Sequence, residues 1–150
     1  MDSSPEKLHS LDALMPMIRQ RLAEGETVCI GPRGTSMLPL IRQGMDAVEL
    51  SPLPQKLKKY DLPLYCVGGK YILHRVVKVG KTYTCLGDNR LNLERGLTHN
   101  QMIAVVTAVY RGDQRIDVDS FGYQCYCRWR HWSRPLRWLW WKLRSLFGKA

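Results

Sequence analysis

Three short stretches of the chain carry side chains that could cooperate in nucleophilic catalysis. The first is Gly-Thr-Ser-Met-Leu-Pro at 34–39, where a glycine frees the backbone just before Ser36 and a proline stiffens it just after. A serine hydroxyl is a weak nucleophile unless it is held against a base and near hydrogen-bond donors, so this chemistry requires fixed presentation. Taken alone, a serine in a turn is more often a solvated turn residue.

The second and third stretches supply a histidine and a carboxylate. His74 lies within an apolar, β-branched segment; it suits either a structural histidine or a general base, since an unperturbed imidazole with a pKa of roughly 6.5 is mostly neutral at pH 7. Asp88 lies in Leu-Gly-Asp-Asn at 86–89, which by itself is ordinary turn chemistry. A hairpin turn at Gly80-Lys81 would return the chain antiparallel and bring Asp88 level with His74, where its carboxylate could accept the second imidazole N–H. Arg75 points to the other strand face and is interpreted as a solvent or ion-pair residue.

The surrounding pattern predicts a mainly β body behind one N-terminal helix. Residues 4–24 have helical apolar spacing, with Ser4 as a cap and Pro16 inside the stretch. Short β-prone segments then alternate with turns such as Gly68-Gly69. The predicted strands are Thr27–Ile30, Ala47–Leu50, Leu62–Val67, Tyr71–Val79, Lys81–Leu86 and Met102–Tyr110. Residues 88–101 are predicted to form a polar loop and 111–120 a surface segment.

The ordered set Gly-x-Ser-Met-x-Pro, His-Arg-Val-Val and Gly-Asp-Asn resembles the signal peptidase superfamily. The match is to the branch of archaea, the eukaryotic reticulum and some Gram-positive bacteria, which uses Ser, His and Asp where most bacterial enzymes use Ser and Lys. The segment 59–65 resembles the family's Lys-Gly-Asp strand, and the whole resemblance covers residues 28–109. It implies a signal peptidase or LexA-like β fold in which Ser36 is acylated, His74 is the base and Asp88 orients it, with Asp61 as the second choice for that third role.

The resemblance also implies a substrate and an oxyanion site. The substrate would be a precursor peptide bound extended along an exposed strand near Ser36, with small residues before the scissile bond and no cofactor. The backbone N–H of Ser36 would be one oxyanion donor. Gly34 stands where the family has a hydroxyl residue, so Thr35 or a second amide would have to replace that donor. The family's Gly-Asp after the nucleophile appears here as Gly44-Met45-Asp46, and an amphipathic helix stands in place of its N-terminal membrane helix.

Two other interpretations of this resemblance stay open. One is self-cleavage as in LexA-type repressors, although those use a lysine base where this chain has His74. The other is a non-catalytic, membrane-tethered binding module that keeps the peptidase fold.

The net charge of +10 is concentrated at the C-terminal end. Residues 1–122 hold all 13 acidic residues and 16 of the 23 Lys and Arg, whereas 123–150 hold seven basic residues, no acid and all five tryptophans. From Ser133 to Phe147, before Gly148, apolar residues fall on one helical arc. A basic, Trp-rich amphipathic helix predicts attachment to an anionic membrane surface. The residues expected to bind the membrane are Trp129, Trp132, Trp138, Trp140, Trp141, Arg134, Arg137, Lys142 and Arg144. The alternatives are packing on the domain or in a dimer; nucleic acid is disfavoured because the sequence of the body indicates no basic patch or stacking surface.

We therefore expect an N-terminal helix over 1–25, a catalytic β domain over 26–122 and an amphipathic tail over 123–150. Charged residues interrupt residues 1–25 and no apolar run of 18 residues occurs, so neither a secretory signal nor a membrane-spanning helix is predicted. The five cysteines are expected to be free thiols rather than disulfides or metal ligands. These features favour a peripheral membrane protein on the cytoplasmic side; the oligomeric state stays open.

Overall fold

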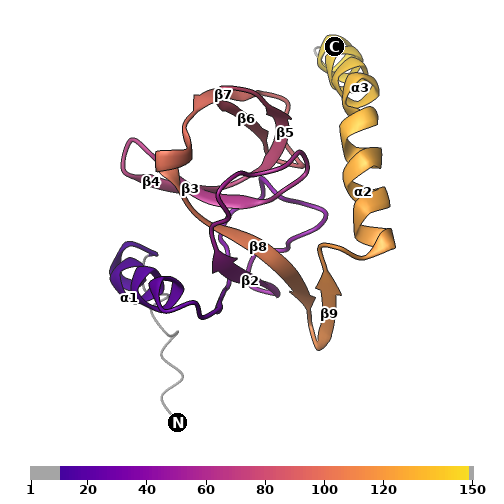
Figure 1. Ribbon diagram of the computed structural model, residues 1–150. Helices are drawn as coiled ribbons and strands as arrows, with labels where there is room; N and C mark the ends of the chain where they lie inside the picture. Colours follow the sequence, from indigo (N-terminus) through magenta and orange to yellow (C-terminus); the bar gives the residue numbers. More distant parts are fainter. Residues whose placement is uncertain (1–10, 149–150) are drawn as a thin grey trace.

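The computed structural model describes residues 11–148 and consists mostly of β-structure (Figure 1). Two antiparallel sheets curve into a half-barrel, with one helix before them in the sequence and two after them. In chain order the elements are α1 (Leu11–Ala23), β1 (Val28–Ile30), β2 (Asp46–Pro52), β3 (Pro63–Val67), β4 (Lys70–Leu73), β5 (Arg75–Val79), β6 (Tyr83–Leu86), β7 (Glu94–Leu97), the 3₁₀ turn η1 (His99–Gln101), β8 (Met102–Arg111), β9 (Gln114–Asp117), α2 (Phe121–Trp132) and α3 (Arg134–Phe147).

The larger sheet is built around the long strand β8. Its order is β1-β2-β8-β3-β4, and β9 pairs with the far end of β8. Along β8 the buried residues Met102, Ala104 and Val106 alternate with half-buried ones, the period-2 pattern of a strand with one face in the core. Strands β1 and β4 form the two ends of this sheet, and within residues 11–148 no further strand pairs with the outer backbone edge of either.

The chain passes from the larger sheet to the smaller one at His74. The predicted single strand Tyr71–Val79 is therefore two strands: β4 ends at Leu73 and pairs with β3, while β5 begins at Arg75 and pairs with β6 in the second sheet, β5-β6-β7. The predicted hairpin turns at Gly68-Gly69 and Gly80-Lys81 are confirmed. Gly68 and Gly69 have φ of 57° and 78°, the left-handed conformation that a tight hairpin requires and glycine adopts readily.

The half-barrel encloses two clusters of buried apolar side chains. The larger cluster lies between the six-stranded sheet and the helices α1 and α2, and the smaller one fills the space beside the second sheet. Helix α1 buries Met15, Ile18 and Leu22, at the helical spacing predicted for residues 4–24. The expected cap at Ser4 and the first turns lie outside the described residues.

Three regions differ from the sequence-based expectations. The predicted polar loop 88–101 contains strand β7, and the predicted surface segment 111–120 contains strand β9. The predicted tail helix from Ser133 is confirmed as α3, but a further helix, α2, precedes it and packs onto the β body through Tyr123 and Cys127. The expected boundary between 122 and 123 therefore falls inside a helix that belongs to the body. Among residues 11–148, no helix is both long and apolar enough to cross a bilayer.

Candidate functional site

Ser36 lies in the loop between β1 and β2, at the wall of a cavity. The loop is shaped by Gly34, whose φ of +92° suits glycine and whose N–H donates to Gln43 Oε1 at 2.8 Å. The cavity encloses about 460 Å³. Its walls come from three segments of the chain: Pro32, Arg33, Gly34, Thr35, Ser36, Met37 and Ile41; Tyr71, Ile72, Leu73 and His74; and Arg90, Asn92 and Glu94. The structure thus brings Ser36 and His74 to one cavity.

The imidazole of His74 is held by a carboxylate that the sequence analysis did not select. His74 Nδ1 lies 2.9 Å from Glu94 Oε1, and the hydroxyl of Tyr65 donates to Glu94 Oε2, also at 2.9 Å. Burial lowers the pKa of His74 below its ordinary value of 6.5, against an opposing, smaller influence of Glu94. The ring is therefore neutral at pH 7. Its Nδ1–H then points at Glu94, which leaves the lone pair of Nε2 free to accept a proton.

Gly87 is the point at which the serine loop and the histidine meet. A methyl group placed on its Cα would lie 2.7 Å from the carbonyl oxygen of Ser36 and 3.1 Å from Nε2 of His74. Both distances are shorter than ordinary contacts, so only a residue without a side chain fits here. The Nε2 side of the ring and the backbone of Ser36 therefore border the same methyl-sized space.

The Gly-Asp-Asn motif holds the serine loop in place. The backbone N–H of Asn89 donates to the carbonyl of Ser36 at 2.8 Å, and its side-chain amide donates to the carbonyl of Thr35 at 3.1 Å. The backbone N–H of Asp88 is directed at the sulfur of Met37 at 3.4 Å. Two consecutive residues thus hold the backbone carbonyls of Thr35 and Ser36 and contact the side chain of Met37.

Asp88 does not occupy the place expected for it beside His74. Its carboxylate forms a bidentate ion pair with Arg75, at 2.9 and 3.0 Å, and accepts the hydroxyl of Tyr126 at 2.7 Å. The backbone carbonyl of Asp88 accepts guanidinium N–H groups from Arg130 and Arg137. The reason is strand alternation: Arg75 faces away from His74, as predicted, and Asp88 reaches the Arg75 side, beneath α2.

The other residues singled out from the sequence have structural partners of their own. Asp61 accepts the backbone N–H of Lys58 at 2.7 Å, and burial raises the pKa of the Asp61 carboxyl. No contact joins Asp61 to His74 within the described chain, so the second choice for the orienting carboxylate is not placed there either. Thr35 lines the cavity next to Ser36.

The serine hydroxyl and the imidazole share the cavity without being bonded. Among residues 11–148, Ser36 Oγ makes no hydrogen bond, and neither does the backbone N–H of Ser36. Catalytic hydrogen bonds are often long without substrate and tighten when substrate binds. The geometry is thus that of a serine and a neutral histidine facing one hollow, with a free amide on the serine.

A larger groove adjoins this cavity and lies between β1 and β4, the two outer strands of the larger sheet. It encloses about 1070 Å³ and shares Pro32, Arg33, Tyr71 and Leu73 with the cavity at Ser36. One wall is β1 with its continuation, the other is β4, and Leu11 and Leu14 of α1 contribute apolar surface. Unpaired edges on either side make this groove suitable for an extended peptide.

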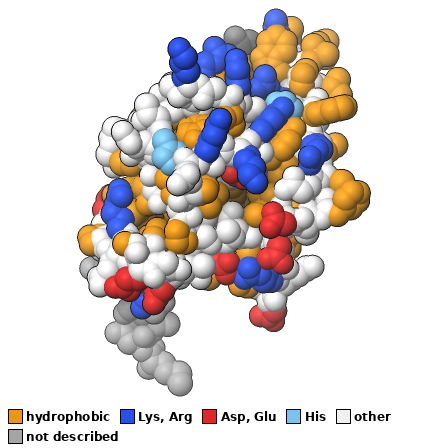
Figure 2. Space-filling model, viewed as in Figure 1, with side chains coloured by type: hydrophobic (Ala, Val, Ile, Leu, Met, Phe, Trp, Pro, Cys, Tyr) orange, Lys and Arg blue, Asp and Glu red, His pale blue; other side chains and the backbone are white. Residues whose placement is uncertain are grey.

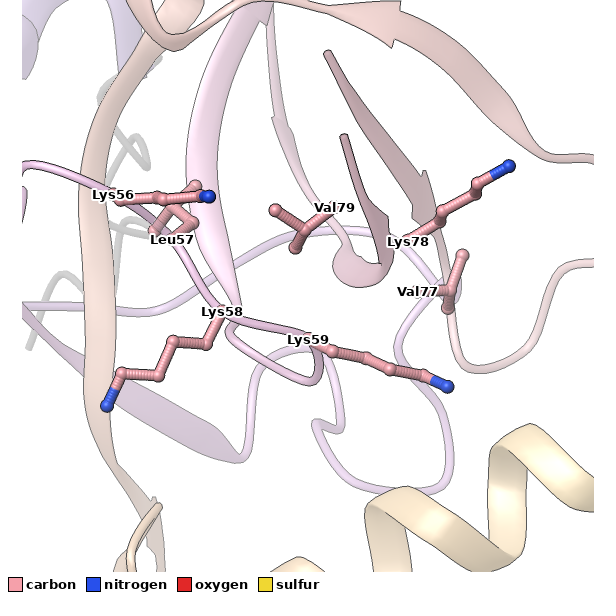
Figure 3. Close-up of a pocket in the computed structure, with 7 residues that line it drawn as sticks. All are labelled: Lys56, Leu57, Lys58, Lys59, Val77, Lys78 and Val79. Atoms are coloured by element: carbon pink, nitrogen blue, oxygen red, sulfur yellow. The ribbon is translucent and has the colours of Figure 1, made fainter. Parts of the chain in front are cut away.

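A separate hollow on the molecule has a different chemical character. It encloses about 640 Å³ between the loop 56–59 and strand β5, and is lined by four lysines with three apolar residues (Figure 3). The lysines are Lys56, Lys58, Lys59 and Lys78. The described residues that line this hollow include no serine, cysteine, histidine or carboxylate, so its chemistry is that of a cationic surface.

Two site residues, Glu94 and Tyr65, were missed by the sequence analysis. Glu94 stood in a segment interpreted as loop, and it reaches His74 because β7 pairs with β6 at Cys85. Tyr65 was visible only as one aromatic residue in a predicted strand. No local pattern marks either residue, since both act through pairing between distant segments.

The comparisons with known proteins return no match: no family model, curated protein or solved structure matches this chain.

All five cysteines are free. In the part of the chain that the structure describes, no three His, Cys, Asp or Glu side chains are grouped as metal ligands.

Proposed function

We propose that this protein is a serine endopeptidase of the signal-peptidase type, with Ser36 as nucleophile, His74 as general base and Glu94 as the carboxylate that orients the histidine. The observation that carries the proposal is the arrangement of His74: Nδ1 is bound to a carboxylate at 2.9 Å, while Nε2 borders the backbone of Ser36 in a shared cavity. A neutral imidazole held in one tautomer beside a serine is the functional core of a triad. The resemblance of the ordered motifs to signal peptidases favours the same chemistry.

The reaction would proceed in two steps, acylation of Ser36 and hydrolysis of the acyl-enzyme. Ser36 Oγ attacks the scissile carbonyl while His74 Nε2 accepts its proton, and Glu94 stabilises the imidazolium that forms. The imidazolium then protonates the leaving amine, which gives an acyl-enzyme. A water molecule, deprotonated in turn by His74, hydrolyses the ester and restores the serine. The free N–H of Ser36 would donate to the oxyanion, and Thr35, which lines the same cavity, carries a hydroxyl that could supply a second donor.

The substrate would be a peptide segment in extended conformation. The groove between β1 and β4 has an unpaired backbone edge on each side, and it opens into the cavity at Ser36. A bound strand could satisfy one edge with main-chain hydrogen bonds, which favours a precursor with an unstructured cleavage segment. Small residues before the scissile bond are expected from the resemblance to signal peptidases.

The two other interpretations are separable from this one. A self-cleaving chain would shorten on incubation at a rate independent of its concentration. A non-catalytic binding module would have no need for an orienting carboxylate on His74, so the pair at 2.9 Å favours catalysis.

The test is labelling with a fluorophosphonate probe, followed by mass spectrometry of precursor peptides incubated with the protein. We expect the wild type to be labelled and to cleave, and Ser36→Ala to lose both by about 10³-fold or more. Ser145→Ala, which removes an exposed serine of α3, is the matched control and should behave as wild type. Equal labelling and cleavage by wild type and Ser36→Ala would refute the proposal.

A further inference from the structure

Helices α2 and α3 act as one rod with a common register. Ser133, between them, has helical φ and ψ of −79° and −7°. Its N–H donates to the carbonyl of Trp129 and its carbonyl accepts from Arg137, each at 2.9 Å and each spanning four residues. The helical rotation therefore continues through the junction, and Figure 1 shows the helices end to end along one side of the half-barrel.

One face of this rod is committed to the protein body. Tyr123, Cys127 and Arg130 are buried, and Arg130 and Arg137 both donate to the carbonyl of Asp88. Arg137 was predicted to be one of the membrane-binding residues. Because its guanidinium faces the body, we no longer assign it to them. The four body-facing residues fall on one side of a helical wheel, so the opposite face of both helices must point outward.

The outward face is a long apolar stripe whose members are all exposed to solvent. Its members lie within about a third of the helical circumference at 100° per residue. The stripe consists of Phe121, Trp129, Trp132, Leu136, Leu139, Trp140, Leu143, Leu146 and Phe147, with exposures from 45% for Leu143 to 85% for Phe121. No residue of α3 is buried, and Figure 2 shows hydrophobic side chains gathered over α2 and α3. Soluble monomers rarely expose so extended an apolar surface without a partner.

The charges around the stripe identify the chemistry of that partner. Residues 123–150 contain seven basic residues and no acidic one. Lys142 and Arg144 lie over the rings of Trp138 and Trp140, at 4.9 and 5.2 Å, on the borders of the stripe. A second copy of the same stripe would bring cation against cation. An anionic lipid surface offers hydrocarbon for the stripe, phosphate for the cations and an interfacial zone that suits indole rings.

The lysine-lined hollow extends this cationic surface beside α2. Lys59 lies over the ring of Tyr60 at 5.2 Å, and the same ring is covered by Arg128 of α2 and packs against His131. Lys59 is therefore a neighbour of α2, and the other three lysines line the same hollow. Each lysine close to an anionic bilayer adds to binding through phosphate contacts.

We propose that the outward face of α2 and α3, from Phe121 to Phe147, together with the lysine-lined hollow, docks the protein onto an anionic lipid bilayer surface. This inference is independent of the proposed peptidase activity. The body-facing side of α2 and α3 binds Asp88, and the serine loop lies behind Asp88. A protein docked through the outward face would therefore keep the cavity at Ser36 connected to its membrane-bound helices.

The experiment is flotation of the full chain with vesicles of phosphatidylcholine, alone or mixed with phosphatidylglycerol at three to one. We expect strong binding to the mixed vesicles and weak binding to the neutral ones. Leu139→Gln/Leu143→Gln should reduce the partition coefficient about tenfold, because two apolar side chains leave the hydrocarbon. Met17→Gln/Met45→Gln replaces two similarly exposed apolar residues away from the stripe and should not change it.

A third variant and one further measurement separate the possible partners. Replacing Lys56, Lys58, Lys59 and Lys78 by Gln should lower binding to mixed vesicles about tenfold or more while sparing neutral ones; unchanged binding would overturn the part assigned to the hollow. Light scattering tests the alternative of a second copy. A dimer abolished by Leu139→Gln/Leu143→Gln, with no vesicle binding by wild type, would overturn the lipid proposal, as would equal flotation of the leucine and methionine variants. Circular dichroism checks that each variant is folded.

Discussion

His74 and Arg75 are consecutive residues, yet each pairs with a carboxylate in a different environment. The His74–Glu94 pair borders a cavity, with side-chain exposures of 12% and 31%. The Arg75–Asp88 pair is sealed beneath α2, with exposures of 2% and 3%. The two pairs lie on opposite sides of the chain where β4 ends and β5 begins, and Gly87-Asp88 runs between them.

The difference in burial separates a pair that can exchange a proton from one that cannot. An imidazole near neutral pH changes its charge readily, and the cavity beside it admits a reacting group. A guanidinium stays protonated: burial lowers the pKa of Arg75, but Tyr123 and the carboxylate of Asp88, with its two parallel hydrogen bonds, together raise that pKa above its ordinary value. We therefore assign chemistry to the open pair and support of the serine loop to the sealed one.

The largest expected effect comes from breaking the sealed pair. Asp88→Asn would leave the guanidinium of Arg75 buried without its counter-charge, which should lower the free energy of unfolding by about 3–5 kcal/mol. Glu94→Gln, at the partly exposed pair, should lower it by about 1 kcal/mol or less. Urea denaturation of both variants measures the difference. Equal losses would mean that the two pairs do not differ in the way their burial indicates.

The second-largest effect concerns the catalytic rate, which Glu94→Gln should reduce more than Asp88→Asn. Glu94→Gln should reduce kcat/KM about 100-fold or more, because the imidazole loses both its orientation and the stabilisation of its protonated form. In the wild type, burial already lowers the pKa of His74, so activity should fall only as pH drops through a value below 6.5. Glu94 raises that pKa, so its removal should move the acid limb to still lower pH.

This pH prediction can be checked without relying on turnover. An NMR titration of the His74 ring in wild type and Glu94→Gln reports the pKa directly. A His74 pKa that rises in the variant, or an acid limb above pH 6.5 in the wild type, contradicts the assignment of Glu94.

The smallest expected effect comes from the two tyrosines that each support one carboxylate. Tyr126→Phe removes a hydrogen bond of 2.7 Å to the sealed carboxylate of Asp88 and should lower the free energy of unfolding by about 1–2 kcal/mol. Tyr65→Phe removes the bond of 2.9 Å to Glu94, where water can replace it, and should lower it by about 0.5–1 kcal/mol. Activity should fall severalfold in Tyr65→Phe and stay near wild type in Tyr126→Phe. Thermal unfolding and initial rates test this pair, and the reverse pattern would reject the division of roles.

Much of the local structure could be predicted from the sequence. Strands β1, β2, β3, β6 and β8, the hairpins at Gly68-Gly69 and Gly80-Lys81 and the apolar face of α1 follow from periodicity and turn residues, which are properties of neighbouring positions. The amphipathic helix α3 follows from the same periodicity. The opposite orientation of His74 and Arg75 follows from alternation along an extended chain.

The choice of partners was decided only in three dimensions. Asp88 is closer to His74 in the sequence than Glu94 is. However, β7 pairs with β6 and brings Glu94 to the imidazole ring of His74, while α2 covers Asp88 and Arg75. Strand pairing and helix packing join segments that are distant along the chain, and a contact energy depends on distance in space rather than on separation in sequence. Residue spacing therefore specifies which groups are available for chemistry, and packing specifies which of them meet.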